Sequence, residues 1–309
     1  MMHHLLRAAI LAGFAMLIVY LFRTGEMILY IAPRMEIWIK LSAIGLYTAA
    51  VYQVYMALKA RSGKRTASCG CDHAPPPSRI KNVMIYGLFL FPLLLGFLAP
   101  TGTLGSALAA KKGVSLNGSG SIARLNDETA PSKQKASELD RTESDTGEQA
   151  EAPNPSDDSD ALDTLFPSDQ YTVDHAAYGK LLYEQELIAV PEKQFIETLT
   201  TLDLYREAFI GKEVEITGFV YREEEMGEDR IAVSRFAMNC CSADALPYGL
   251  MIIWPKAREY GEDEWVRVRG KLTTSLYREH EIIVIDTRKI ERIEAPESPY
   301  VYPDLEFGS

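Results

Sequence analysis

The segment Val214-Glu-Ile216-Thr-Gly218-Phe-Val220 alternates apolar residues with other residues at a period of two, as a strand with one buried face does. Further runs rich in β-branched residues follow it along the chain. They occupy residues 231–236, 249–254, 265–270 and 282–285, the last continuing through 290–293. Charged or glycine-containing turns bound each run. The sequence therefore predicts a mainly-β domain built on five short strands.

Two glycines within these runs favour one arrangement of the strands. Gly218 and Gly270 lie inside predicted strands, where a barrel must bend sharply and a side chain would obstruct its closure. A break at residues 255–260 follows the third strand. These features predict an OB-like five-stranded barrel, partly open and of Greek-key order. A flat sandwich of the same strands is the alternative.

The residues before the first of these strands predict a short α/β segment. Residues 181–190 have the composition of a strand, and Pro191 suits the first position of a helix that reaches about Ala208. Gly211 ends this segment. Helical spacing is carried by four apolar residues, Phe195, Ile196, Leu199 and Leu202.

Two adjacent thiols and a carboxylate, Cys240, Cys241 and Asp244, follow the second strand of the predicted barrel. Successive side chains of a strand point to opposite faces, so the segment is expected to leave the strand at Cys240. Three uses remain open: a strained redox-active disulfide, thiolate ligands for a soft divalent ion such as zinc with Asp244 assisting, or a structural role. Arg235 is expected to lower a thiol pKa.

The distribution of charge excludes one class of partner. Residues 1–112 carry twelve basic and three acidic residues, whereas residues 164–309 carry sixteen and twenty-eight. An acidic domain is unsuited to phosphate backbones, so we expect no nucleic acid. Four aromatic residues could otherwise stack on bases, but we expect most of them to lie in the core. They are Tyr221, Phe236, Trp254 and Trp265.

The basic front of the chain, residues 1–112, predicts three membrane spans at about residues 5–22, 37–58 and 82–100. A signal peptide is the competing interpretation of the first, but its apolar run is too long. The loop at residues 59–81 carries six basic residues and only Asp72 as an acid, which predicts that it is cytoplasmic. We therefore expect a multi-pass protein of the cell membrane, in contact with the lipid bilayer, whose C-terminal domain is extracellular.

Residues 113–163 are rich in Ser, Gly, Pro, Asp and Glu and show no apolar periodicity. Such a segment cannot bury enough apolar area to offset the entropy of ordering it. It is predicted to be a disordered acidic linker to the domain at residues 164–309.

A second thiol group lies in the predicted cytoplasmic loop. Cys69, Cys71 and His73 alternate with Gly70 and Asp72 and can converge on one soft divalent ion. Three ligands are one fewer than usual. A reduced, exposed loop without a metal is the alternative.

The order of these features, with Thr217-Gly-Phe-Val-Tyr221, Arg235-Phe-x-Met-x-Cys-Cys-x-Ala-Asp244 and Pro299-Tyr-Val-Tyr302, resembles the YcgQ-like family. This resemblance implies that the chain is a subunit of a two-component permease of Gram-positive bacteria. The resemblance implies a partner, a larger multi-spanning YcgR-like permease, which is itself similar to permeases linked to arsenical export.

The leading functional hypothesis is a non-enzymatic subunit of such a permease complex, which handles or senses a soft metal or metalloid ion through its thiols. An extracellular thiol-redox protein and an envelope scaffold or binding module are the alternatives. We expect no catalytic residues, because the distal domain offers only His175 and His280 as imidazoles and neither has a triad around it.

Overall fold

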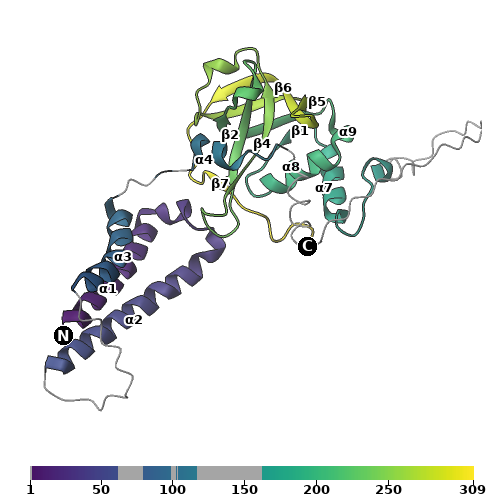
Figure 1. Cartoon of the computed structure of the whole chain (residues 1–309). Helices are drawn as coiled ribbons and strands as arrows, with labels where there is room; N and C mark the ends of the chain where they lie inside the picture. The colour runs from purple at the N-terminus through teal and green to yellow at the C-terminus, as the bar shows by residue number, and fades with distance from the viewer. Residues whose placement is uncertain (1, 62–78, 99–101, 103, 117–161) are drawn as a thin grey trace, which may run out of the picture. The chain divides into compact units, whose positions relative to one another are not determined.

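The computed structural model describes the whole chain except residues 1, 62–78, 99–101, 103 and 117–161 (Figure 1). The described chain divides into two compact units. The first comprises Met1–Thr103 together with Cys240–Asp244, and the second Leu104–Asn239 with Ala245–Ser309. Almost all of the predicted linker, and most of the basic loop at residues 59–81, lie outside the described residues.

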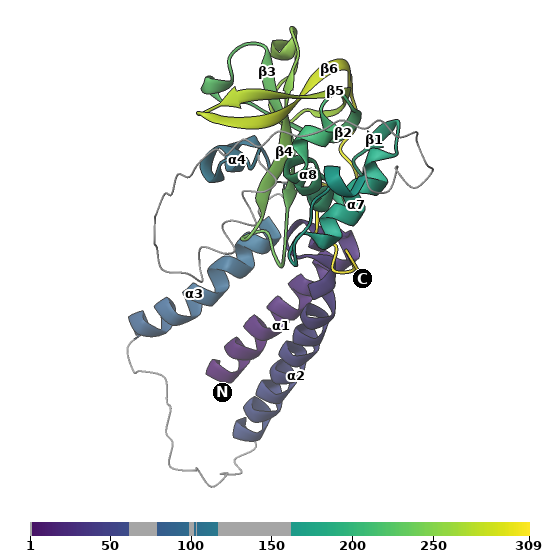
Figure 2. The ribbon, with the colours of Figure 1, turned by 90° about the vertical axis from the view of Figure 1, so that its right-hand side faces the viewer.

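The first unit contains the three apolar helices that the sequence predicted. They are α1 (Met2–Thr24), α2 (Glu36–Arg61) and α3 (Arg79–Leu98), and each is long and apolar enough to cross a membrane. Figure 2 shows α1 and α2 side by side along most of their length. Small side chains permit this close approach. The buried alanines of the two helices are Ala8 and Ala15 of α1 and Ala43, Ala50 and Ala57 of α2.

The third helix packs on the first by a reciprocal exchange of leucines and glycines. A Cβ atom added at Gly13 of α1 would lie 2.6 Å from Leu93 Cδ2, and one added at Gly96 of α3 would lie 2.7 Å from Leu17 Cδ2. Each leucine thus fills the space over a glycine of the other helix. This is the small-residue packing typical of apolar helices, which lack a hydrophobic driving force between them in lipid.

The connection between α1 and α2 is a compact loop. Gly25, at φ 77°, starts a short 3-10 helix, η1 (Glu26–Leu29), and Pro33 begins a second, η2 (Pro33–Met35). Residues 30–32 between them include an isolated bridge position at Ile31.

The second unit contains a seven-stranded sheet of order β1-β2-β5-β6-β4-β3-β7. The predicted mainly-β domain is confirmed, and so are its five main strands. The β5 and β6 strands are longer than predicted, because they continue as an antiparallel hairpin to Tyr277 and His280. The five main strands are β2 (Glu213–Tyr221), β3 (Arg230–Ala237), β4 (Leu246–Ile253), β5 (Trp265–Tyr277) and β6 (His280–Arg292).

One additional pairing joins β2 and β3, which are not neighbours in the strand order of the sheet. The end of β2 pairs antiparallel with β3, with Phe219 opposite Ser234, while the rest of β2 pairs with β5. The β4 and β6 strands pair in parallel. The pairings therefore connect the five main strands in a ring, β2-β5-β6-β4-β3 and back to β2.

Glycines lie at positions of this ring where the neighbouring backbone leaves no room for a Cβ atom. A Cβ at Gly218 would lie 2.5 Å from the Ser234 carbonyl oxygen, and one at Gly270 would lie 2.2 Å from the Asp286 carbonyl oxygen. Gly270 also adjoins an irregularity in the β5–β6 register. Both positions were expected to require glycine, and Gly249 is a third that was not foreseen.

The segment before β2 differs in detail from the prediction. Residues 181–183 end a helix, α7 (Val173–Tyr183), and the strand is only β1 (Leu187–Ala189). The next helix, α8 (Phe195–Leu204), begins four residues after Pro191, and α9 (Arg206–Phe209) follows it. Figure 1 shows these helices gathered beside the sheet near β1. Their apolar faces join the sheet's inner face in one core, in which Phe166 and Phe209 pack with ring centroids 5.6 Å apart.

Both ends of the second unit pack onto the sheet. The short β7 (Tyr300–Val301) pairs in parallel with the end of β3. The short helix α4 (Ser106–Lys112) follows the three apolar helices in the sequence but belongs to the second unit. The carboxylate of Asp263 accepts hydrogen bonds from the backbone N–H and the hydroxyl of Ser106, and Ser115 forms a parallel bridge with Tyr248.

Candidate functional site

The two cysteines lie in the connection between β3 and β4, beyond the end of the strand at Ala237. One carboxylate organises this turn. Asp244 Oδ2 accepts the backbone N–H of Cys240 at 2.7 Å and that of Cys241 at 3.4 Å, while the Asp244 N–H donates to the Cys241 carbonyl oxygen at 3.0 Å. The short side chain of aspartate suits this role, because it can bond to nearby backbone without leaving the turn.

This geometry brings three candidate ligands together. Cys240 Sγ and Cys241 Sγ lie 3.7 Å apart as free thiols, too far for the bond of about 2.05 Å that a disulfide requires. One ligand atom from each of Cys240, Cys241 and Asp244 lies within 4.8 Å of the others, and all three residues are partly buried. Two sulfurs and a carboxylate are a donor set that zinc and similar soft or borderline ions accept.

The carboxylate also affects the protonation of the Cys240 thiol. Hydrogen bonding to Asp244, and then to Cys241, raises the pKa of the Cys240 thiol to about 11. The expectation that Arg235 lowers a thiol pKa is therefore wrong for Cys240. Negative charge beside a thiol disfavours the thiolate in the absence of a cation, and the same charge attracts a cation to the turn.

Arg235 has other partners. Its side chain is buried, and its guanidinium donates to Glu192 Oε1 at 2.9 Å and to the Ser298 carbonyl oxygen at 2.5 Å. The ring of Trp265 lies 5.5 Å from its Cζ. Arg235 thus joins the connection between β1 and α8, the β3 strand and the segment before β7, which is a structural role.

Three residues of the α1–α2 connection complete the surroundings of the turn. Ile31 and Cys241 form an antiparallel bridge, flanked by a bond from Ala32 N–H to the Cys240 carbonyl oxygen (3.1 Å) and one from Ser242 N–H to the Tyr30 carbonyl oxygen (2.8 Å). All of these residues belong to the first compact unit. This pairing could not be predicted from the sequence, because a bridge of two backbone hydrogen bonds between distant loops needs no particular side chains.

The other predicted ligands are not brought to this site by anything that the structure describes. Cys69, Cys71 and His73 lie outside the described residues. Of the aromatic residues expected in the core, Tyr221 and Phe236 are buried, whereas Trp254 and Trp265 are partly exposed.

The structure thus describes a protein with three apolar helices, a mainly-β domain and a turn that carries two adjacent cysteines. Family models match both halves of the chain: the DUF1980 N-terminal domain at residues 6–115 and the DUF1980 C-terminal domain at residues 165–303. The UPF0703 protein YcgQ of Bacillus subtilis (strain 168) is 26% identical over 310 residues, which span 96% of this chain and 98% of that protein. The chain belongs to the YcgQ-like DUF1980 family. No solved structure matches it.

Proposed function

We propose that the chain is a non-enzymatic, multi-pass subunit of a two-component permease complex, and that its Cys240–Asp244 turn binds a soft divalent ion for transfer to or from a larger multi-spanning partner of the YcgR-like kind. The observation that carries the proposal is the convergence of two thiols and one carboxylate within 4.8 Å. With three protein ligands, a fourth position is left for water or for a ligand from the partner.

The arrangement of the strands supports a binding domain rather than an enzyme. The ring of five pairings, with β4 and β6 parallel, has the connectivity of a small OB barrel, and we infer that fold for the domain. OB domains commonly bind ligands through strand faces and loops. Here the β3–β4 connection carries the candidate ligands.

The bridge to the α1–α2 connection bears on the proposed topology. A loop that pairs with residues 30–32 must share their side of the membrane if α1 and α2 span it. The basic loop at residues 59–81 follows α2 and would lie on the opposite, cytoplasmic side. Both observations favour an extracellular C-terminal domain and therefore an ion site on the outer side of the membrane.

A thiol-redox function is the second candidate, since the two sulfur atoms are 3.7 Å apart. The raised pKa of Cys240 weighs against it, because thiol–disulfide exchange proceeds through the thiolate. Adjacent cysteines also form a strained ring when bridged. We therefore place ion binding first.

Metal titration of the full-length protein in detergent tests the ion site. Cadmium serves as the probe, because each thiolate bound to it adds ultraviolet charge-transfer absorbance. We expect a signal for two thiolates from this turn that the Cys240→Ser/Cys241→Ser variant loses. The matched control, Cys69→Ser/Cys71→Ser, should keep it. An unchanged signal in the first variant, or no cadmium bound in the control, would refute the ion site.

The partner is tested separately, by affinity purification of the tagged chain from native membranes. We expect a multi-spanning permease to co-purify in a defined ratio. Recovery of the intact chain alone, under mild detergents that preserve other membrane complexes, would contradict the proposed complex.

A further inference from the structure

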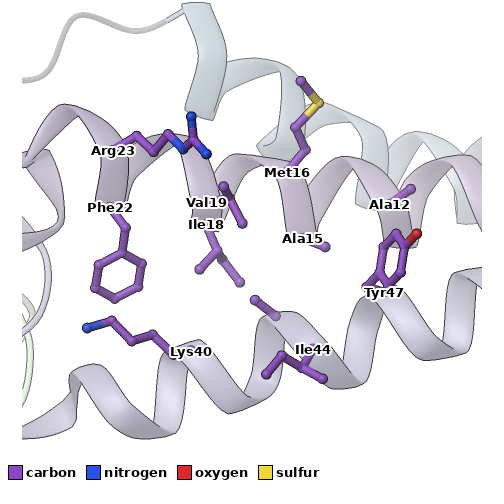
Figure 3. Close-up of a pocket in the computed structure, with 11 residues that line it drawn as sticks. Ala12, Ala15, Met16, Ile18, Val19, Phe22, Arg23, Lys40, Ile44 and Tyr47 are labelled. Atoms are coloured by element: carbon purple, nitrogen blue, oxygen red, sulfur yellow. The ribbon is translucent and has the colours of Figure 1, made fainter.

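An apolar groove with a volume of about 760 Å³ runs between α1 and α2 (Figure 3). The buried alanines Ala15 and Ala43 line it, and so do large exposed apolar side chains, among them Met16 and Ile44. Because alanine leaves space that a larger residue would fill, two closely packed helices still leave a groove along their seam.

One end of the groove is positively charged. Arg23 of α1 and Lys40 of α2 lie at the same end as Phe22, and Tyr47 marks the other end (Figure 3). Lys40 pairs with Glu36 at 2.8 Å and lies 4.7 Å from the Phe22 ring centroid. That ion pair is exposed and therefore weak. Arg23 is exposed and has no hydrogen-bond or ion-pair partner among the residues that the structure describes, so a net positive charge remains at this end.

The length of the groove matches one leaflet of a bilayer. From Ala12 to Phe22 an α-helix rises about 15 Å, which is about half of a hydrocarbon core of about 30 Å. The charged end lies beside the last residues of α1 and the first turn of α2, where these helices would meet the membrane surface. An apolar channel one leaflet deep, closed by two cations at the interface, is complementary to an amphiphile with an anionic head.

We propose that this groove binds one acyl chain of an anionic phospholipid, whose headgroup contacts Arg23 and Lys40. This inference rests on the membrane-spanning helices of the proposed function but on neither its metal nor its permease. In the predicted topology the lipid belongs to the outer leaflet. The charge of the headgroup favours an anionic over a zwitterionic phospholipid. A zwitterionic headgroup would place its own positive charge beside Arg23 and Lys40.

Native mass spectrometry of the full-length protein tests the proposal, after exchange into mixed nanodiscs of phosphatidylglycerol and phosphatidylcholine. We expect retention of about one phosphatidylglycerol. Because a basic residue near an anionic surface contributes about fivefold in affinity, Arg23→Gln/Lys40→Gln should reduce the preference by roughly 25-fold. The control Lys59→Gln alters a cation near the other end of α2 and should leave the preference unchanged.

A second variant probes the apolar part of the site without touching the charges. Ala12→Phe fills the far end of the groove from an exposed position and should reduce retention of both lipids. Equal retention of the two lipids by the wild type would overturn the proposal. So would crosslinking of the groove to a second protein chain in native membranes with no lipid retained, which would assign it to a partner helix. Release of the chain from membranes by alkaline carbonate would instead refute the membrane-spanning premise.

Discussion

The carboxylate of Glu192, whose side chain is 63% exposed, pairs at 2.9 Å with Arg235, whose side chain is 2% exposed. The buried guanidinium of Arg235 therefore has its counter-charge on a solvent-exposed side chain. Arg235 Nε has no hydrogen-bond partner among the described residues, so the hydrogen bonds of the guanidinium are made by the two nitrogens that contact Glu192 and Ser298.

Substitution of Glu192 should therefore lower the free energy of unfolding by more than is usual for so exposed a side chain. Glu192→Ala leaves a buried cation without its counter-charge and is expected to lower the free energy of unfolding by about 2–3 kcal/mol. Urea unfolding followed by tryptophan fluorescence provides the measurement. Glu186→Ala, at an exposed position six residues earlier, is the matched control and should change stability by less than about 0.5 kcal/mol. Equal effects in the two variants would show that the pair contributes little.

The close approach of β2 and β3 makes a second prediction. In Gly218→Ala the new Cβ would meet three backbone atoms of Ser234 within 2.9 Å, and a backbone cannot rotate aside as a side chain can. We expect a loss of about 2 kcal/mol or more in unfolding free energy. Gly261→Ala is the control, since its nearest neighbour would lie at 3.5 Å. A Gly218→Ala protein as stable as the control would mean that the two strands separate easily there.

His175 makes the stability of the second unit depend on pH. Burial lowers its pKa below the ordinary 6.5, although the nearby charge of Asp174 acts in the opposite direction. Its ring accepts or donates a bond with Thr201 Oγ1 at 2.8 Å and lies 4.9 Å from the Phe307 ring. Because the folded protein binds the proton less well than the unfolded chain, this contribution is present above pH 6.5 and is lost as pH falls through the folded pKa.

Thermal unfolding measured between pH 7.5 and pH 5 tests this dependence. The wild type should lose more stability over this interval than His175→Gln, whose side chain can still bond to Thr201 but does not titrate. His280→Gln is the control, at an exposed histidine. Parallel curves for the wild type and His175→Gln would contradict the prediction.

The bridge between Ile31 and Cys241 can be captured covalently. The flanking bonds make this a non-hydrogen-bonded antiparallel pair, for which the Cα atoms lie about 4.5 Å apart, within the range that disulfides accept. Ile31→Cys, with Cys240 changed to Ser, should therefore form an intrachain disulfide under mild oxidation. Peptide mass spectrometry would identify it. Leu29→Cys in the same background is the control, and equal crosslinking from both positions would show that the pairing is not specific.

Local patterns were sufficient to predict the elements that bury a continuous apolar face. The period-two runs predicted β2 to β6, and long apolar runs predicted the three apolar helices. Residues 181–183 were assigned to a strand because α7 buries small residues, including Ala176 and Gly179, that give a weak periodic signal. The α4 helix was not foreseen for a related reason, since its seven residues are held by Asp263, far away in the sequence.

In the candidate site, too, the features with a local sequence pattern were predicted and those that depend on distant contacts were not. The residue types and spacing of Cys240, Cys241 and Asp244 predicted that the three could meet, and the turn brings them together. The pKa of the thiol was predicted in the wrong direction, because proximity to Arg235 in sequence does not specify where a strand directs its side chain. The pairing with residues 30–32 depends on backbone groups alone, for which the sequence carries no local code.

The Ile31–Cys241 bridge also constrains how the protein is made. Ile31 is synthesised about two hundred residues before its partner, so at about 5–20 residues per second a ribosome needs roughly 10–40 s to deliver Cys241. Over that interval the α1–α2 connection has no partner for its bridge, and helices α1 and α2 must form and pack without it. Assembly of the first unit therefore ends only after most of the chain has been translated, and a truncated product would expose an unpaired loop that quality-control proteases could recognise.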